Sequence, residues 1–203
     1  MVRRLILALT AAVALGVQTA AAADEHLVVR PYPGPPWTRI TDKSGADGWI
    51  HEQIPASQTE QGFKDILTDQ GFRKLGHQDP ARFLRTLFNN VSGACDAVLV
   101  NGPVSRREGG YDVAYGQVYC GTQRGTNFGV HIFYKVIGAD AALYSVCREF
   151  HVPPSAHAGA LAFPKGEAGQ ATALLNAERA ANDYLASGVY VCGGRSADTR
   201  CGR

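Results

Sequence analysis

Arginine and tyrosine side chains gather near the ends of an expected strand. Arg106 and Arg107 precede the run 111–120, and Arg124 follows it. Three tyrosines alternate along that run and therefore share one face: Tyr111, Tyr115 and Tyr119. Adjacent strand ends can bring three guanidinium groups together beside these rings, and such surfaces are enriched at recognition sites. Our candidate ligand-binding residues are therefore Arg106, Arg107, Arg124 and Tyr115. The guest would be a small anionic ligand, such as a sugar acid, or the acidic patch of a partner. Solvated arginines beside core tyrosines are the alternative.

The six histidines do not follow a metal-binding spacing. Two ligands one helical turn apart would be a simple signature of a transition-metal site, and no such pair falls on an expected helix. His51 and His131 both lie on expected strands, and their imidazoles would meet if those strands paired. We expect no metal site and keep a periplasmic metal-binding protein as an alternative.

No catalytic constellation is visible in the sequence. It contains neither a Gly-x-Ser-x-Gly elbow nor a Cys-x-x-Cys pair. Asp65 and Asp69 lie four residues apart on an expected helix over 58–70, where carboxylates usually form a solvated face. We therefore expect no catalytic residues and no cofactor, which favours a non-catalytic protein. The alternative is a hydrolase of a cell-envelope polymer, with a His/Asp pair or paired carboxylates assembled only in the fold.

The five cysteines predict two disulfides and one free thiol. All lie beyond an expected export signal, and an oxidising compartment permits bridges. The sequence alone leaves the pairing open. We favour Cys95 with Cys120, which would tie a helix end to a strand end, and Cys192 with Cys201, which would close the tail. Cys147 would then be the buried free thiol.

Residues 1–23 have the three parts of a secretory signal peptide. Arg3 and Arg4 give a basic start, residues 5–17 are apolar, and residues 21–23 are small. Cleavage would leave 203 − 23 = 180 residues, in which 20 − 2 = 18 basic side chains balance 18 acidic ones. We expect a periplasmic or secreted protein with no nucleic-acid partner and no membrane span after cleavage.

The remaining chain is expected to form one α+β domain. Residues 24–36 are a proline-rich extended leader, residues 37–190 the domain, and residues 191–203 a loose tail with cysteine and arginine. Besides the helix over 58–70, Asp79 and Pro80 suit the start of a second helix.

A third helix is expected in an alanine-rich stretch over 167–187. Strands are expected over 37–41, 48–54, 97–100, 111–120, 128–137 and 142–150. Residues 102–110 read as a loop. Short separators favour an antiparallel meander of the last three strands, with 128–137 central, covered by helices on one face and partly shielded on the other.

A hairpin, helices, a meander and a closing helix thus follow one another along the chain. Four parts of the sequence carry a resemblance: Trp37, the GWIHEQIP run at 48–55, the SQTEQGF helix start at Ser57 and the YKVIGADAALYSVCREF run at 134–150. These residues resemble the PsbP-like α/β/α sandwich, a fold of non-enzymatic accessory proteins, and are similar to small exported bacterial proteins of unassigned function. The resemblance implies an antiparallel sheet with helices packed on it and carries over no functional residue.

Together these features predict an exported, non-catalytic binding or accessory protein of the bacterial periplasm or cell envelope. Its partner would be an envelope protein or a small anionic ligand. The sequence leaves the identity of that ligand and the oligomeric state open.

Overall fold

The computed structural model describes residues 24–159, 163–164 and 166–202. The expected signal peptide, residues 1–23, lies outside the described residues, and its cleavage stays a prediction. In the described part of the chain, no helix is both long and apolar enough to cross a membrane.

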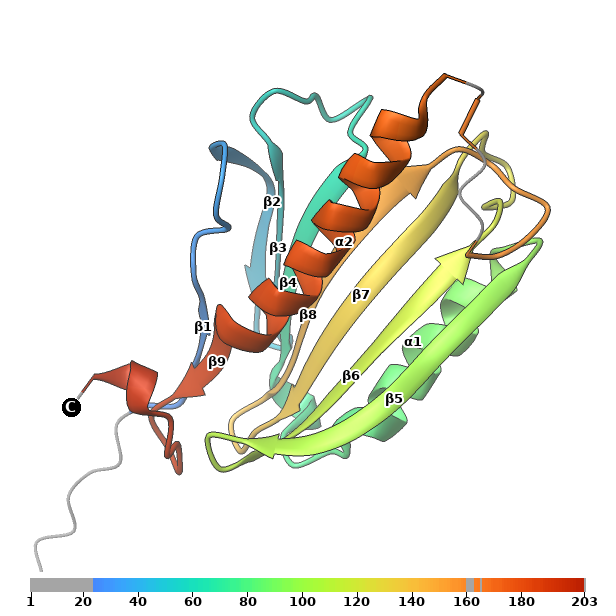
Figure 1. The fold of residues 1–203 in the computed structure, drawn as a ribbon. Coiled ribbons are helices and arrows are strands. Elements are labelled where there is room, and N and C mark those ends of the chain that lie inside the picture. The colour runs from blue at the N-terminus through green and yellow to red at the C-terminus, as the bar shows by residue number, and fades with distance from the viewer. Residues whose placement is uncertain (1–23, 160–162, 165, 203) are drawn as a thin grey trace, which may run out of the picture.

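An antiparallel sheet forms the centre of the molecule (Figure 1). In the described residues it has seven strands in the order β2-β3-β4-β8-β7-β6-β5. Their bounds are β2 Trp37–Gly45, β3 Gly48–Pro55, β4 Asp65–Phe72, β5 Val98–Glu108, β6 Tyr111–Cys120, β7 Gly129–Gly138 and β8 Leu143–Val152. The predicted α+β class and the β6-β7-β8 meander are confirmed.

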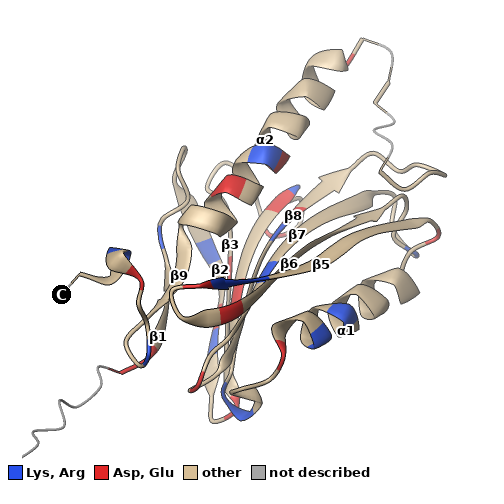
Figure 2. Cartoon of the chain, turned by 60° about the horizontal axis from the view of Figure 1, so that its bottom comes forward, with Lys and Arg blue, Asp and Glu red and all other residues tan. Residues whose placement is uncertain are grey.

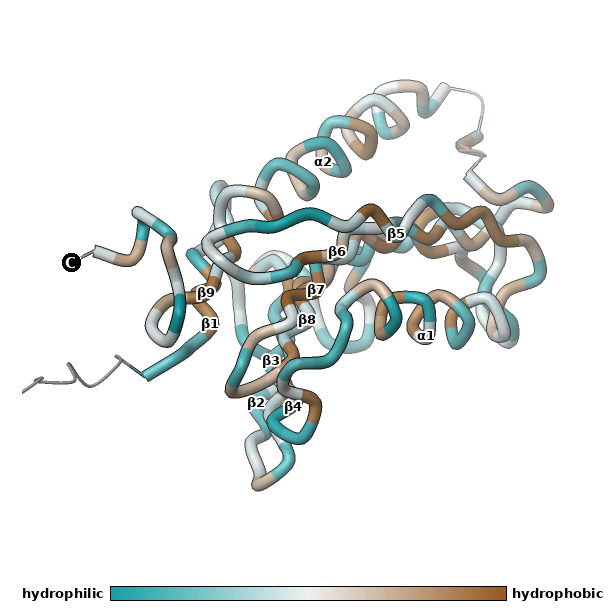
Figure 3. Tube along the Cα trace, turned by 90° about the horizontal axis from the view of Figure 1, so that it is seen from below, coloured by the Kyte–Doolittle hydropathy of each residue, from teal (hydrophilic) through white to brown (hydrophobic). Residues whose placement is uncertain are grey.

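A long helix packs on each face of the sheet, as Figure 3 shows from below. Helix α1, Pro80–Gly93, packs on β5, β6 and β7, and helix α2, Ala168–Ser187, packs on β7 and β8. Helix α1 begins where the sequence predicts, because the Asp79 side chain accepts the backbone N–H of Ala81. A short 3-10 helix, η1 Arg73–Leu75, follows β4.

Every residue of β7 is buried. Its alternate residues enter two apolar clusters: Val136 packs with Leu84 beneath α1, and Phe133 packs with Leu185 beneath α2. The strand is central, as expected, but both of its faces are covered. The sequence analysis expected helices on one face, and the second helix completes the burial of the other.

The expected helix over 58–70 is wrong. Most of its second half is β4, which pairs with β3 on one side and β8 on the other. Ile66 and Leu67 lie on opposite faces of β4, and both are buried. Burial between two neighbouring strands outweighs a local helical pattern. Asp65 and Asp69 therefore project from one face of a strand instead of lying one helical turn apart.

The expected loop over 102–110 is also wrong, because β5 continues to Glu108 and a turn of two glycines leads into β6. The pairing of β5 with β6 shifts in register after Asn101, where Gly102 adopts a φ of 103°. Glycine accommodates this conformation without strain, so it marks an irregularity within a strand here.

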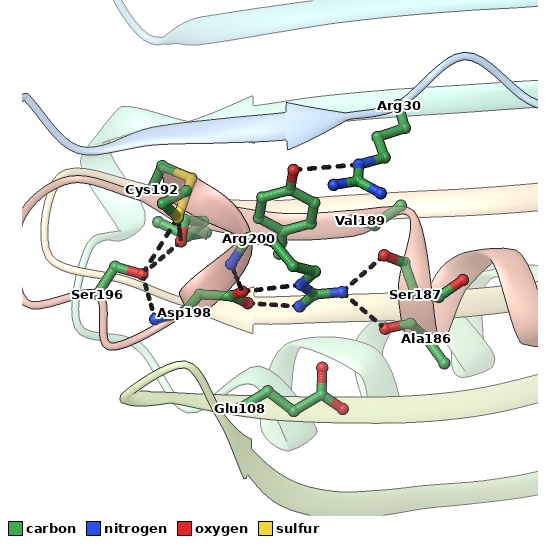
Figure 4. A network of polar contacts seen from close by, with 12 residues as sticks. Arg30, Glu108, Ala186, Ser187, Val189, Cys192, Ser196, Asp198 and Arg200 are labelled. Atoms are coloured by element: carbon green, nitrogen blue, oxygen red, sulfur yellow. Dashed lines mark hydrogen bonds and ion pairs between the residues drawn. A yellow bond between two sulfur atoms is a disulfide. The ribbon is translucent and has the colours of Figure 1, made fainter. Parts of the chain in front are cut away.

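Both ends of the described chain meet beside the main sheet. Strand β1, His26–Val29, pairs antiparallel with β9, Val189–Cys192. The leader contributes β1, and the tail, which the sequence analysis expected to be loose, is held against the fold. A disulfide closes it, η2 Thr199–Cys201 forms within it, and Arg200 donates a hydrogen bond of 2.6 Å to the carbonyl oxygen of Ser187 at the end of α2 (Figure 4).

Candidate functional site

Arg106 and Tyr115 form the arginine–aromatic contact that the sequence analysis sought. They come from neighbouring strands β5 and β6, and the guanidinium carbon lies 4.1 Å from the centroid of the ring. Glu108 accepts the Tyr115 hydroxyl at 2.8 Å, and its Oε1 lies 3.3 Å from Nε of Arg106. Lys135 of β7 donates to the same carboxylate at 2.7 Å. We call these four residues the Arg106 cluster.

The two ends of the Arg106 cluster have different surroundings. Lys135 is 1% exposed, and burial lowers the pKa of its ammonium, an effect that Glu108 opposes. Burial, and then the Glu108 carboxylate, raise the pKa of Tyr115. The Arg106 side chain, in contrast, is 52% exposed. Lys135 therefore holds the cluster from beneath, and Arg106 is the group that a partner can reach.

The three candidate arginines do not converge. Figure 2 shows basic and acidic residues side by side on β5 near its turn, but Arg107 follows Arg106 in the strand and projects from the opposite face. Its Nη1 lies 3.2 Å from Asp112. Arg124 lies beyond the other end of β6, where it donates to the carbonyl oxygens of Gly93 and Cys95 at the end of α1. Strand alternation and strand length keep the three guanidinium groups apart.

The face of β5 and β6 beside α2 carries exposed apolar side chains. Leu99 is 45% exposed and Val104 is 61% exposed. Both point to the face of the Arg106 cluster, because they are register partners of Tyr119 and Tyr115. Helix α2 covers β7 and β8 and leaves this outer part of the sheet uncovered (Figure 1).

Helix α2 adds a third apolar group to the same side. Leu175 is 51% exposed and precedes Asn182 by seven residues, or about two helical turns. The Asn182 side chain accepts a hydrogen bond of 3.1 Å from Gln117 of β6, so this stripe of the helix faces β6. We call the surface formed by Leu99, Val104, Leu175, Arg106 and Tyr115 the open face.

A histidine–carboxylate pair lies on the same side of the sheet, towards β2. Nδ1 of His51 is 2.8 Å from Oδ2 of Asp69, and Nε2 is 3.4 Å from Oδ1 of Asp42. The three residues are register neighbours on β2, β3 and β4. Asp69 is 5% exposed, and a hydrogen bond from Arg39 lowers the pKa of the exposed Asp42.

The His51–Asp69 pair borders a pocket of about 520 Å³ between β1 and the sheet. A histidine oriented by a buried carboxylate is an arrangement that general-base catalysis uses. Sequence reasoning missed this pair because it placed Asp69 on a helix. The signal that could have found it is strand alternation in the segment that became β4. The pocket is lined by Trp49, His51, Gln53, Asp69, Arg73 and Tyr144, among others.

His131 does not join His51, because β4 and β8 separate their strands. It lies buried beneath α2, with Nδ1 2.6 Å from Oε1 of Glu178. The meeting of two imidazoles that the sequence allowed is therefore not formed. Among the residues that the structure describes, no group of three or more His, Cys, Asp or Glu side chains is arranged to hold a metal ion.

The structure contains both favoured disulfides, Cys95–Cys120 and Cys192–Cys201. Cys147 is a free thiol, and its residue is half-buried. Burial raises the pKa of this thiol to about 12. Cys147 is thus protonated at neutral pH, which makes it a poor nucleophile.

Comparison with protein-family models gave no match, and neither did comparison with curated proteins. Among solved structures, the chain is similar to LpqN, described as involved in cell envelope biogenesis of Mycobacterium tuberculosis. The TM-score is 0.38 and the identity 13%, over 84% of each chain. A similarity of this size carries no functional argument. The resemblance to the PsbP-like family is not confirmed.

Proposed function

We propose that this chain is an exported, non-catalytic binding or accessory protein of the bacterial periplasm or cell envelope, and that it holds a partner on the open face. One observation carries the proposal: exposed Leu99, Val104 and Leu175 lie on the same side of the sheet as the exposed guanidinium of Arg106. Grouped apolar side chains on a surface indicate an interaction site. Two disulfides support export, because such bonds persist in oxidising compartments.

The chemistry of the open face defines the partner. Apolar side chains of the partner would be buried against Leu99, Val104 and Leu175, and an acidic group would meet Arg106. The Tyr115 ring already orients this guanidinium, so little side-chain entropy is lost on binding. We propose an envelope protein with an apolar segment beside a carboxylate. The PsbP-like resemblance belongs to this proposal, because it implies an accessory role.

Site-directed photo-crosslinking in the native periplasm tests the open face. A photoreactive amino acid replaces Val104 in one variant and Thr38 in a control. Thr38 is exposed on β2, the opposite edge strand of the sheet. We expect a discrete crosslinked species from position 104 and none from position 38. An Arg106→Ala change in the position-104 variant should weaken the crosslink. Equal labelling at both positions, or none at position 104, would contradict the proposal.

Export and domain boundaries are part of the same proposal. Cleavage after residue 23 would give a mature chain that begins just before β1, and its folded part would extend beyond the expected domain of 37–190, because β1 pairs with β9. The intact mass of the protein purified from the periplasm without refolding tests the cleavage and counts the disulfides. A mass that retains residues 1–23 would contradict it.

A second candidate function, hydrolysis of a cell-envelope polymer, is favoured by the His51–Asp69 pair. The 2.8 Å contact orients the imidazole at the edge of a pocket of about 520 Å³. His51 would take a proton from an attacking water, and Asp69 would stabilise the imidazolium that forms. The imidazolium would then give this proton to the leaving group of the cleaved bond. Substrate would first displace Asp42 from Nε2, which an exposed carboxylate permits.

Release of soluble fragments from purified cell-wall polymer tests this candidate. We expect release by the wild-type protein, with loss of at least about a hundredfold in His51→Gln, in line with the usual size of general-base catalysis. His26→Gln is the matched control, because His26 lines the same pocket and is exposed. No release by the wild-type protein, or equal release by all three proteins, would exclude the candidate.

A further inference from the structure

A second pocket lies at the end of the sheet where β5 turns into β6 and β7 turns into β8. Its volume is about 570 Å³. Arginine and histidine side chains reach it from three segments: Arg107 of β5, His77 before α1, and Arg195 of the C-terminal tail. Arg106 also borders it, but the Arg106 guanidinium lies over the Tyr115 ring and contacts Glu108. Apart from Arg106, the pocket shares no residue with the open face.

The two guanidinium groups of this pocket already have partners. Arg107 donates to the carbonyl oxygen of Gly110 at 2.6 Å, and its other terminal nitrogen lies 3.2 Å from Asp112. Arg195 lies 3.3 Å from Asp140. The Arg107–Asp112 pair is exposed, and exposed pairs contribute little to stability because water competes for each charge. A ligand anion can therefore replace Asp112 at low cost, whereas Arg195 would keep Asp140, whose Oδ1 is buried, as a second partner.

The charge of the ligand follows from this replacement of a protein carboxylate by a ligand anion. A singly charged anion would gain little, because each guanidinium already has one carboxylate beside it. A ligand with two or more charges can accept from both guanidinium groups at once, with the bidentate geometry that arginine offers to phosphate and carboxylate. His77, whose Nδ1 lies 3.2 Å from Asp140, stands at the same edge.

The C-terminal tail positions one of the two guanidinium groups. Arg195 lies inside the loop that the Cys192–Cys201 disulfide closes, over a sequence separation of nine. Ala197 donates to the carbonyl oxygen of Gly109 at 2.8 Å, which holds the loop on the turn between β5 and β6. The same loop is held on the end of α2, because Arg200 pairs with Asp198 and donates to Ser187 (Figure 4).

We propose that this pocket binds a small molecule with two or more phosphate or carboxylate charges, through Arg107 and Arg195, and that the disulfide-closed tail completes the site. The inference goes beyond the proposed function, since it concerns a different surface and a different class of ligand. The tail thereby has a role in binding as well as in stability.

Calorimetric titration of the oxidised mature chain tests the site. The probes are inorganic pyrophosphate and citrate, with acetate as the singly charged comparison. We expect saturable binding of at least one probe and none of acetate, with affinity that falls as salt rises. Pyrophosphate binding alone would assign the site to phosphates, and citrate binding alone would assign it to carboxylates. No binding of either probe would overturn the proposal.

Substitutions then locate the binding. Arg107→Ala and Arg195→Ala should each weaken the affinity about tenfold, the size expected for loss of a charge-assisted hydrogen bond. Arg179→Ala is the matched control, because Arg179 is exposed on α2 away from the pocket lining. Equal affinity in all four proteins would overturn the proposal.

A last variant tests the tail. Cys192→Ser combined with Cys201→Ser should reproduce the loss seen in Arg195→Ala, and adding Arg195→Ala should cause no further loss. Near-ultraviolet circular dichroism checks the fold of each protein. If the serine variant does not fold, Arg200→Ala loosens the tail with the disulfide intact and should also weaken binding. Unchanged affinity in a folded tail variant would overturn the role of the tail.

Discussion

On the α2 side of the sheet, the half that α2 covers and the half beyond α2 each contain an arginine beside a tyrosine. One arginine is buried and the other is exposed. Beneath α2 and the leader, Arg148 is 3% exposed and pairs with Asp65, with its guanidinium 3.9 Å from the Tyr32 ring. Beyond α2, Arg106 lies 4.1 Å from the Tyr115 ring but is 52% exposed. Both arginines stack on a tyrosine. The covering segment, and not the residue type, therefore decides whether such a pair stabilises the fold or is open to a partner.

The largest effect on stability is expected when the buried Arg148–Asp65 pair in the covered half is broken. Asp65→Ala would leave Arg148 as a buried charge without its carboxylate, and its Nη1 already has no hydrogen-bond partner among the described residues. Breaking a buried pair in this way costs about 3–5 kcal/mol of unfolding free energy. Urea denaturation of the oxidised protein measures this change. A loss below about 1 kcal/mol would show that the covered pair behaves like a surface pair.

An intermediate effect is expected where the tail holds the end of α2, the helix that separates the two halves. The hydrogen bond from Arg200 lowers the pKa of Asp198 below 3.8. Asp198→Asn should therefore lower the unfolding free energy by about 1–3 kcal/mol near neutral pH. A lowered carboxyl pKa stabilises the fold above the unfolded-state pKa, and that stabilisation is lost as pH falls through the folded-state value.

Denaturation of wild-type and Asp198→Asn protein from about pH 7 down to about pH 3 tests this sign. The difference in stability should be full at the upper end and should shrink below pH 3.8. A difference that grows as the pH falls would contradict the role of the Asp198–Arg200 pair. Ser187→Ala is a control, since Arg200 contacts the backbone oxygen of this residue and not its side chain.

The smallest effect on stability is expected on the open half. Arg106→Ala should change the unfolding free energy by less than about 1 kcal/mol, because Arg106 is exposed and Lys135 still pairs with Glu108. The same substitution should weaken the crosslink from position 104. A large loss of stability in Arg106→Ala would remove the contrast between the two halves and assign Arg106 to the fold.

The sequence predicted the parts of the fold that depend on local pattern. Asp79 and Pro80 marked the start of α1, and residues 111–120 read as a strand because β-branched and aromatic residues fill it. It did not predict β4, because Ile66 and Leu67 match a helix as well as a strand buried on both faces. Only pairing with β3 and β8 decides between the two.

Some features of the candidate site could likewise be predicted from the sequence, and others could not. The contact of Arg106 with Tyr115 was within reach of the sequence, since the two residues flank a short turn. The separation of Arg107 from Arg106 was not, because residues 102–110 were expected to be a loop, in which neighbouring side chains need not alternate. Strand alternation turned Arg107 away from Tyr115, and Arg107 lines the pocket with Arg195.

The α+β class, the central meander and the five cysteines that can form two bridges could be read from the sequence. These follow from hydrophobic period, turn residues and composition, which act over a few residues at a time. Three features depend on the tertiary structure. His51 contacts Asp69, Arg148 is buried while Arg106 is exposed, and Arg195 lies beside the end of β5. Each of these depends on which strands pair and which segment covers them, and that is set by burial summed over the whole chain.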